Sequence, residues 1–245
     1  MADFKVTNWD EFTSKYNKLP KRQGHFLAPR WPFFMLVVGG TGSGKSNVAL
    51  DLMFKYLYYD RVYMYVKKPN EDKMDFVREY YANLCKVKNE EGKKNGTKSD
   101  YKLSDILFIG GVDDIKDPSD YNPEYQNLVV FDDMVVEKHQ ERIAETFIRG
   151  RGSNCSCIYM TQSFADVPGA IRKQCNYIVL FKIANETANL VRRYYCGDID
   201  KDTFMKIFHE ATGRKHDFLM IASDEYSPVL KFRRNWNEFL DPASL

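Results

Sequence analysis

The sequence has little that is typical of a secreted or membrane protein. Its five cysteines form no Cys-x-x-Cys pair, which favours reduced, buried thiols in an intracellular protein over disulfides or a zinc site. The most apolar stretch, residues 31–38, has the length of a strand, whereas a membrane helix needs about 18 residues or more. The first twelve residues include Asp3, Asp10 and Glu11, so we expect no secretory signal there and no membrane partner.

The sequence also lacks a large excess of charge of one sign. Its 36 Lys and Arg residues against 34 Asp and Glu residues leave a formal net charge of +2, so a polyanionic partner would need a local basic patch. With 245 residues, of which 44% are apolar, the chain can bury a sizeable core and is not disordered throughout.

Apolar segments that alternate with amphipathic ones predict an α/β fold. Continuous apolar runs, typical of strands buried on both faces of a sheet, occur at 33–38, 61–66, 106–109, 128–131, 155–160 and 177–181. Helices are expected at 44–58, 71–84, 138–148, 186–195 and 202–211. A hairpin of 217–221 and 229–232 is expected to follow. Together they predict a doubly wound, mainly parallel sheet flanked by helices, with a small C-terminal hairpin.

Two segments differ in composition from this pattern. Residues 1–30 mix aromatic and basic side chains with two prolines, and we interpret them as an N-terminal arm, with a short helix at 8–16, that docks on one domain formed by 31–245. Residues 86–102 contain six lysines and almost no apolar residue. They are predicted to be a flexible excursion inside the domain.

The most specific motif follows the first apolar strand. Gly39, Gly40, Thr41, Gly42, Ser43, Gly44, Lys45 and Ser46 match the phosphate-binding pattern G-x-x-x-x-G-K-[ST] in full. Glycines let successive backbone N–H groups point at phosphate oxygens, and the helix that follows adds its positive end. We expect Lys45 to reach the β- and γ-phosphates of ATP and the Ser46 hydroxyl to bind Mg²⁺. Residues 39–46 and Asn47 are the predicted nucleotide-binding residues.

A second strand, 127–131, ends in two acids, Asp132 and Asp133. This is the Walker B pattern, in which the first acid helps to hold Mg²⁺ beside Ser46. The second, Asp133, is then a candidate general base for the attacking water. The next strand ends in a Thr-Gln-Ser sequence, and its Gln162 is predicted to lie near the γ-phosphate, where it would orient the water or sense the phosphate.

Other P-loop classes lack their signatures here. No Asn-Lys-x-Asp motif occurs, and no Asp-x-x-Gly follows the acidic strand, which excludes a typical GTPase. The Leu-Ser-Gly-Gly-Gln signature of ABC ATPases is also absent from the sequence.

These motifs, together with Arg149-Gly150-Arg151-Gly152 before the glutamine strand, resemble the FtsK/HerA superfamily of DNA-pumping ATPases. The likeness, over about residues 33–185, is greatest to the genome-packaging ATPases of poxvirus-like large DNA viruses and of virophages. It implies a homo-oligomeric ring that moves double-stranded DNA without reading its sequence, with Arg149 or Arg151 as an arginine finger supplied across the subunit interface. It also implies capsid proteins as partners, and a location in the cytoplasm of an infected cell and in the virion. Many superfamily members have Glu where Asp133 stands.

Two alternatives remain open from the residues alone. A P-loop nucleoside or small-molecule kinase fits the chain length, and the pairs Arg192-Arg193 and Arg233-Arg234 could belong to the arginine-rich lid of such an enzyme. The second alternative is a nucleotide-dependent scaffold that binds ATP without useful hydrolysis. Lys93 and Lys94, in the segment 86–102, are candidates for a DNA-gripping pore loop, although a solvated loop would have the same composition.

Overall fold

The computed structural model describes residues 22–96, 100–135 and 137–244, and the structural statements below refer to these residues. The helix expected at 8–16 lies outside them. Within the described part of the chain, no helix is long and apolar enough to span a membrane.

The strands form one nine-stranded sheet in the order β3-β2-β4-β5-β1-β6-β7-β8-β9. Neighbouring strands among β1 to β6 are parallel, whereas β7, β8 and β9 pair antiparallel at one edge. The parallel strands are β1 (Phe34–Val38), β2 (Arg61–Val66), β3 (Leu107–Gly110), β4 (Asn127–Asp132), β5 (Cys155–Thr161) and β6 (Tyr177–Leu180). The antiparallel ones are β7 (Leu219–Ala222), β8 (Phe232–Arg234) and β9 (Glu238–Phe239). The predicted mainly parallel sheet is confirmed.

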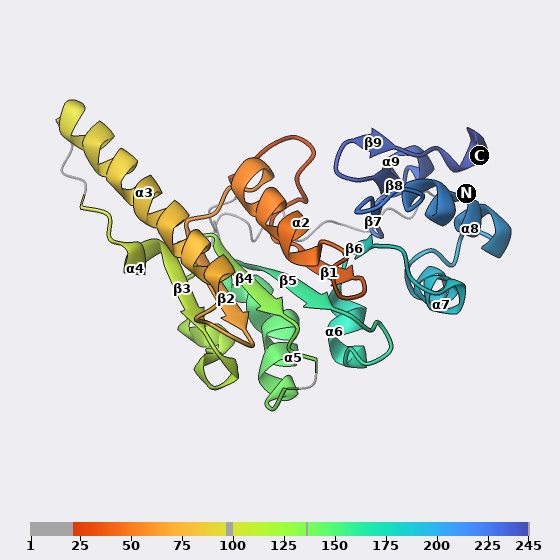
Figure 1. Cartoon of the computed structure of the whole chain (residues 1–245), viewed down its shortest axis with the longest axis horizontal. Coiled ribbons are helices and arrows are strands. Elements are labelled where there is room, and N and C mark those ends of the chain that lie inside the picture. The colour runs from red at the N-terminus through yellow and green to blue at the C-terminus, as the bar shows by residue number, and fades with distance from the viewer. Residues whose placement is uncertain (1–21, 97–99, 136, 245) are drawn as a thin grey trace, which may run out of the picture.

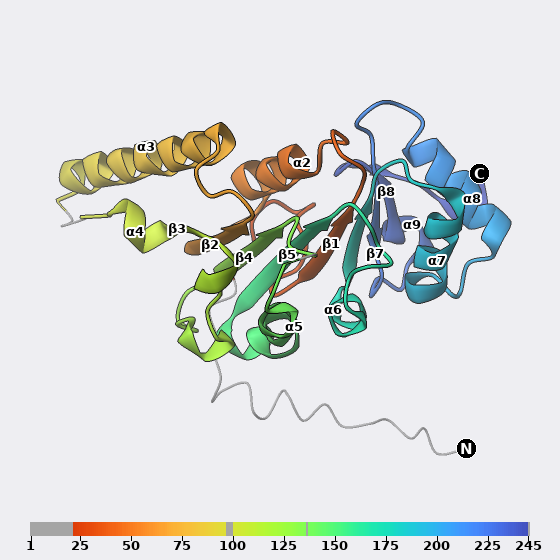
Figure 2. The same ribbon diagram turned by 60° about the horizontal axis from the view of Figure 1, so that its bottom comes forward.

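Helices cover both faces of the sheet (Figures 1 and 2). One face is covered by α2 (Lys45–Asp51), the π-helix η1 (Leu52–Tyr56) and α3 (Asp72–Lys94). The other is covered by α5 (Gln140–Arg149), α6 (Gly169–Gln174), α7 (Asn185–Tyr195) and α8 (Lys201–Ala211). Shorter helices are α4 (Leu103–Ile106), α9 (Pro228–Lys231) and the 3-10 turns η2 (Val112–Asp114), η3 (Pro118–Asp120), η4 (Gly150–Ser153) and η5 (Pro242–Ser244).

The two faces have separate hydrophobic cores, which explains why the central strands are apolar along most of their length and not only at alternate positions. In β1, Phe34, Leu36 and Val38 belong to one core, and Met35 and Val37 belong to the other. All five residues are almost completely buried. A parallel strand between two helical layers has no solvent-facing side and needs no polar alternation. The five cysteines are free and buried, as the sequence predicts.

The segment around residues 86–102 differs from its prediction. Helix α3 continues to Lys94, so the expectation of a flexible excursion is wrong for residues 86–94. Lys and Glu have high helix propensity, and this end of α3 extends beyond the sheet (Figure 1), where it needs no apolar face. The Asn89 side chain fixes the returning chain, because its amide donates to the carbonyl of Tyr101 at 3.0 Å and its oxygen accepts from the Tyr101 backbone N–H at 2.7 Å.

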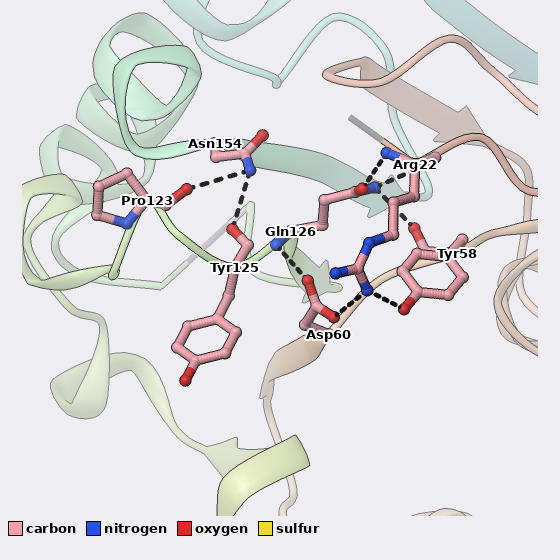
Figure 3. A network of polar contacts seen from close by, with 7 residues as sticks. All are labelled: Arg22, Tyr58, Asp60, Pro123, Tyr125, Gln126 and Asn154. Carbon is pink, nitrogen blue, oxygen red and sulfur yellow. Dashed lines mark hydrogen bonds and ion pairs between the residues drawn. The ribbon is translucent and has the colours of Figure 1, made fainter. Parts of the chain in front are cut away.

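Two buried amide side chains organise the edge of the sheet where the parallel strands begin (Figure 3). Gln126 is fully buried, and its amide donates to the carbonyls of Arg22 and Tyr58, each at 3.1 Å. Asn154, also fully buried, donates to the carbonyl of Tyr125 at 3.1 Å. Buried polar groups need such partners. These contacts fix the strand starts, and they leave the opposite edge, where the strands end, for the site.

Candidate functional site

The glycine-rich loop joins the end of β1 to the start of α2, and its backbone requires glycine at several positions. Gly42 and Gly44 have φ angles of 73° and 109°, in the left-handed region that favours glycine. At Gly39, a Cβ atom would lie 2.6 Å from the Ser43 hydroxyl oxygen and 2.8 Å from the ring of Phe181. At Gly40 and Gly42, no atom of the described residues lies within 4 Å of where a Cβ atom would stand. The loop is therefore closely packed underneath and open on its outer side, where a ligand can approach.

Lys45 and Ser46 stand at the start of α2 and face the acidic strand. The Lys45 ammonium donates to the carbonyls of Gly39 and Gly40 at 2.7 and 3.1 Å. Burial lowers the pKa of Lys45, and the carboxylates of Asp132 and Asp133 oppose that shift. Ser46 and Asn47 follow in the first turn of α2, and the Asn47 side chain is exposed.

Asp132 is the last residue of β4 and lies against the P-loop helix. The Ser46 hydroxyl donates to its Oδ2 at 3.3 Å. Burial raises the pKa of Asp132, and the hydrogen bond from Ser46 is the main influence that lowers it. A serine hydroxyl beside a carboxylate is a ligand pair of the oxygen type that Mg²⁺ prefers. The structure therefore brings both predicted metal residues together.

Gln162 connects the P-loop to the second acid. Its amide nitrogen donates to both carboxylate oxygens of Asp133, at 3.3 and 3.1 Å. Its oxygen accepts a hydrogen bond from the Thr41 hydroxyl at 2.9 Å. The sheet order explains this arrangement, because β5 lies between β1 and β4, and Gln162 directly follows β5. A series of side-chain hydrogen bonds therefore joins Thr41 of the P-loop, through Gln162, to Asp133.

The local structure fits a bound Mg²⁺–ATP. The Ser43 hydroxyl is buried and has no hydrogen-bond partner among the residues that the structure describes, which is unusual for a buried polar group. Among the described residues, the Lys45 ammonium donates only to carbonyls of the loop. A phosphate oxygen can take the place of these carbonyls or bind the ammonium beside them. Ser46 and Asp132 would hold the metal, which supplies charge neutralisation for the phosphates when bound.

The two candidate finger residues lie elsewhere in the subunit. Arg149 ends α5, with its guanidinium 3.8 Å from a carboxylate oxygen of Asp117. The Arg151 guanidinium lies over the ring of Phe34, 4.7 Å from the ring centroid. Phe34 begins β1, and the P-loop follows the other end of this strand, about 13 Å away at 3.3 Å per residue. Within one subunit the structure does not bring either arginine to the site.

One part of the site is not among the residues that the sequence predicts. The loop 212–217, between α8 and β7, lies against the P-loop, and the His216 Nδ1 atom is 3.0 Å from the carbonyl oxygen of Ser43. A cavity of about 420 Å³ separates this loop from residues 40–43. Arg214, Lys215 and His216 directly follow a glycine in the sequence, but no pattern links His216 to Ser43, 173 residues earlier.

A second cavity, of about 260 Å³, lies on the acidic side of the P-loop. Ser46, Asp132 and Asp133 line it together with the start of α3 and the loop before it, which contribute Lys67, Lys68, Glu71 and Lys73. The P-loop therefore has one cavity on each side, and only this one contains the two acids.

A glycine loop between a parallel strand and a helix, with two acids and a glutamine at adjacent strand ends, defines a P-loop ATPase. The chain belongs to the Poxvirus A32 protein family, whose model matches residues 26–228. No curated protein matches the chain in a sequence comparison.

Solved structures share the fold. The DNA-packaging ATPase B204 from Sulfolobus turreted icosahedral virus is 12% identical and has a TM-score of 0.51, with 83% of this chain and 97% of that chain covered. The genome-packaging NTPase B204 from Sulfolobus turreted icosahedral virus 2, in complex with ATP-gammaS, is 13% identical with a TM-score of 0.50, covering 83% and 97%. Its complex with AMP is also 13% identical, with a TM-score of 0.50, and the match covers 83% of this chain and 96% of that chain. The likeness confirms the P-loop ATPase fold.

Proposed function

We propose that this chain hydrolyses ATP to drive double-stranded viral DNA into a capsid, working as a homo-oligomeric ring. The observation that carries the proposal is the contact between Gln162 and Asp133 beside the P-loop. A carboxylate held by a side-chain amide at this place can accept a proton from an attacking water. The site is therefore suited to hydrolysis, which a motor needs, more than to transfer of phosphate to a bound nucleoside.

Each site residue has a role in this proposal. Lys45 contacts the β- and γ-phosphates, and residues 39–47 surround the nucleotide. Ser46 and Asp132 hold Mg²⁺. Asp133 acts as the general base, and Gln162 orients it and reports the state of the phosphates to Thr41. Such positioned acid–base and electrostatic groups supply most of the rate in phosphoryl transfer.

The ring is supported by where the arginines stand. The side chains of Arg149 and Arg151 are exposed at the edge where the parallel strands begin, whereas the P-loop lies where they end. In this position they do not reach the P-loop of their own subunit, which supports a role at the site of a neighbouring subunit. An arginine supplied in trans is worth about 10³- to 10⁵-fold in rate.

The biological setting is supported by the family and by the solved relatives, which are described as DNA-packaging or genome-packaging enzymes. DNA is gripped through its phosphates, capsid proteins are the docking partners, and the work takes place in the cytoplasm of an infected cell and at the virion. In this proposal residues 31–245 act as one ATPase domain, with 1–30 as its arm.

The experiment that tests the proposal measures ATP hydrolysis with and without duplex DNA, and with a panel of nucleosides, at low salt. We expect ADP and phosphate as products, with DNA stimulating the rate. A phosphorylated nucleoside would support the kinase alternative, and neither activity would support the scaffold. Lys45→Ala must abolish the activity. Lys55→Ala is the matched control, because Lys55 is exposed on η1 and pairs only with Asp51 among the described residues.

A further inference from the structure

The two cavities beside the P-loop differ in which strand ends they adjoin. The cavity of about 260 Å³ contains Asp132 and Asp133, which follow β4. The cavity of about 420 Å³ contains Phe181 and Lys182, which follow β6. In the sheet, β4 and β6 lie on opposite sides of β1. The loop therefore separates a side that carries the two acids from a side that carries an aromatic floor, and lysines line both cavities.

The direction of a bound triphosphate follows from this difference. Hydrolysis requires the γ-phosphate to lie beside Asp133 and Gln162, since a general base must be within hydrogen-bond reach of the attacking water. A nucleotide whose terminal phosphate lies on the β4 and β5 side, and whose other phosphates follow the loop, leaves the loop on the β6 side. Its ribose and base then meet the larger cavity.

Loop 212–217 can cover a ligand in the cavity of about 420 Å³, because both ends of the loop are fixed by hydrogen bonds. At its start the Thr212 hydroxyl is buried and donates to the Phe208 carbonyl at 2.7 Å. At its end the Asn235 amide donates to the carboxylate of Asp217 at 3.0 Å. His216 has a left-handed φ of 71° and bonds to the carbonyl of Ser43. Residues 213–215, between these anchors, are exposed.

We propose that the cavity between the P-loop and loop 212–217 holds the base and ribose of the nucleotide, and that Arg214 stacks on the base. The Phe181 ring packs against Gly39 and Gly44 and forms an apolar floor. A guanidinium is flat and weakly hydrated, and it stacks on aromatic faces in a way that a lysine ammonium cannot. Arg214 lines this cavity from the loop, and His216 holds the loop against the P-loop.

Photolabelling with 8-azido-ATP decides between the two cavities. After irradiation, proteolysis and mass spectrometry, we expect the label in peptides that contain residues 181–182 or 212–217, and we expect excess ATP to prevent it. Label in residues 66–74, which adjoin the acidic cavity, would overturn the proposal. Labelling requires neither DNA nor a ring, so the result is independent of whether the chain proves to be a DNA motor.

The role of Arg214 is tested by comparing ATP with inorganic tripolyphosphate, which lacks base and ribose. Arg214→Ala should raise the Kd for ATP about 3- to 30-fold, the range of a cation–π contact, and leave the Kd for tripolyphosphate unchanged. Arg214→Lys should restore only part of that affinity, because the ammonium keeps the charge but lacks the flat face that stacks on the base. Equal weakening of both ligands, or full rescue by lysine, would overturn the stacking role. Arg193→Ala, exposed on α7, is the matched control.

Discussion

Asp133 has a backbone conformation that few residue types adopt. Its φ angle is 55°, in the left-handed region where Asp and Asn are enriched among residues other than glycine. Its backbone N–H donates to the carbonyl of Met160 at 3.1 Å, which ties this turn to β5. Its side chain meets Gln162. The turn therefore directs a short carboxylate toward the strand end that carries the glutamine, and a longer Glu is not needed for that contact.

Asp133→Asn should keep ATP binding and lose turnover. The amide has the same shape but no basic oxygen, so we expect kcat to fall by about 10²- to 10⁴-fold, the usual contribution of a general base. The Kd for ATP, measured by fluorescence titration, should change little. Glu137→Gln is the control, because Glu137 is an acid that pairs with Lys67 at 3.5 Å. Turnover above about a tenth of wild type in Asp133→Asn would assign the base to another group.

The buried carboxylate of Asp132 is expected to lower the free energy of unfolding when no metal is bound. Burial raises its pKa above the ordinary 3.8, so the folded state keeps this proton at pH values where the unfolded chain has lost it. The contribution of Asp132 to the free energy of unfolding therefore decreases as the pH rises from 3.8 through the raised pKa of the folded state. Above that pKa, the folded protein bears the full cost of a buried, charged carboxylate.

Asp132→Asn removes that penalty and retains an acceptor for Ser46. We expect the variant to gain up to about 1 kcal/mol in urea unfolding at about pH 7.5 without Mg²⁺. The gain should shrink as the pH is lowered toward 3.8. The variant should also lose the extra stability that Mg²⁺–ATP gives to the wild type. A variant that is less stable than wild type at every pH, or that Mg²⁺–ATP still stabilises equally, would contradict the assignment.

At the scale of elements, the sequence predicts the strands that carry the site better than it predicts their surroundings. The apolar runs locate β1, β2, β4 and β5 almost to the residue, because strands buried on both faces cannot be polar. The position of Gln162 was predicted from one rule, that consecutive strands of a parallel sheet lie near one another. In the structure β5 is indeed between β4 and β1.

The remaining elements depend on tertiary contacts that leave no local pattern. Loop 212–217 meets the P-loop only because β7 pairs antiparallel with β6, and that pairing is not visible in the loop itself. The end of α3 was misjudged for the opposite reason. A helix that extends beyond the sheet needs no apolar stripe, so its polar sequence looks like that of a loop.

The helical end of α3 changes how its lysines can act on DNA. Lys93 and Lys94 are exposed on its last turn, at the end of α3 that extends beyond the sheet. The double variant Lys93→Gln/Lys94→Gln should leave ATP hydrolysis without DNA unchanged and weaken its stimulation by duplex DNA. If both lysines contact phosphates, the slope of log affinity against log salt should become shallower by about 1.8.

The control for α3 is Lys173→Gln/Lys201→Gln, which removes the same charge from exposed positions on α6 and α8. An equal loss of DNA stimulation in both double variants would mean that total charge matters and that α3 is not a specific contact.

At the scale of the whole molecule, the positions of Arg149 and Arg151 constrain how two subunits can contact each other. Arg149 and Arg151 lie where the parallel strands begin, and the P-loop lies where these strands end. If either arginine serves a neighbouring subunit, as proposed, two copies face each other with opposite ends of their parallel strands in contact, which is a heterologous interface. Repetition of such an interface closes into a ring when the rotation allows it. Each hydrolysis site would then be shared by two neighbours.

Shared sites predict that two inactive variants can restore each other. Arg149→Ala or Arg151→Ala should bind ATP normally and hydrolyse it poorly, and Lys45→Ala should be inactive. When the finger variant is mixed with Lys45→Ala, interfaces that join an intact P-loop to an intact arginine should regain activity. The measurement is ATPase rate against mixing ratio, with DNA at low salt because phosphate contacts weaken steeply as salt rises.

The control for complementation is a mixture of Lys45→Ala with Asp133→Asn. Both defects belong to the same half of the site, so no interface in that mixture is complete and no activity should return. Specific activity of the wild type should also fall on dilution, as rings dissociate. A specific activity that stays constant down to concentrations where only monomer is present would contradict the ring, because a site complete within one subunit does not depend on its neighbours.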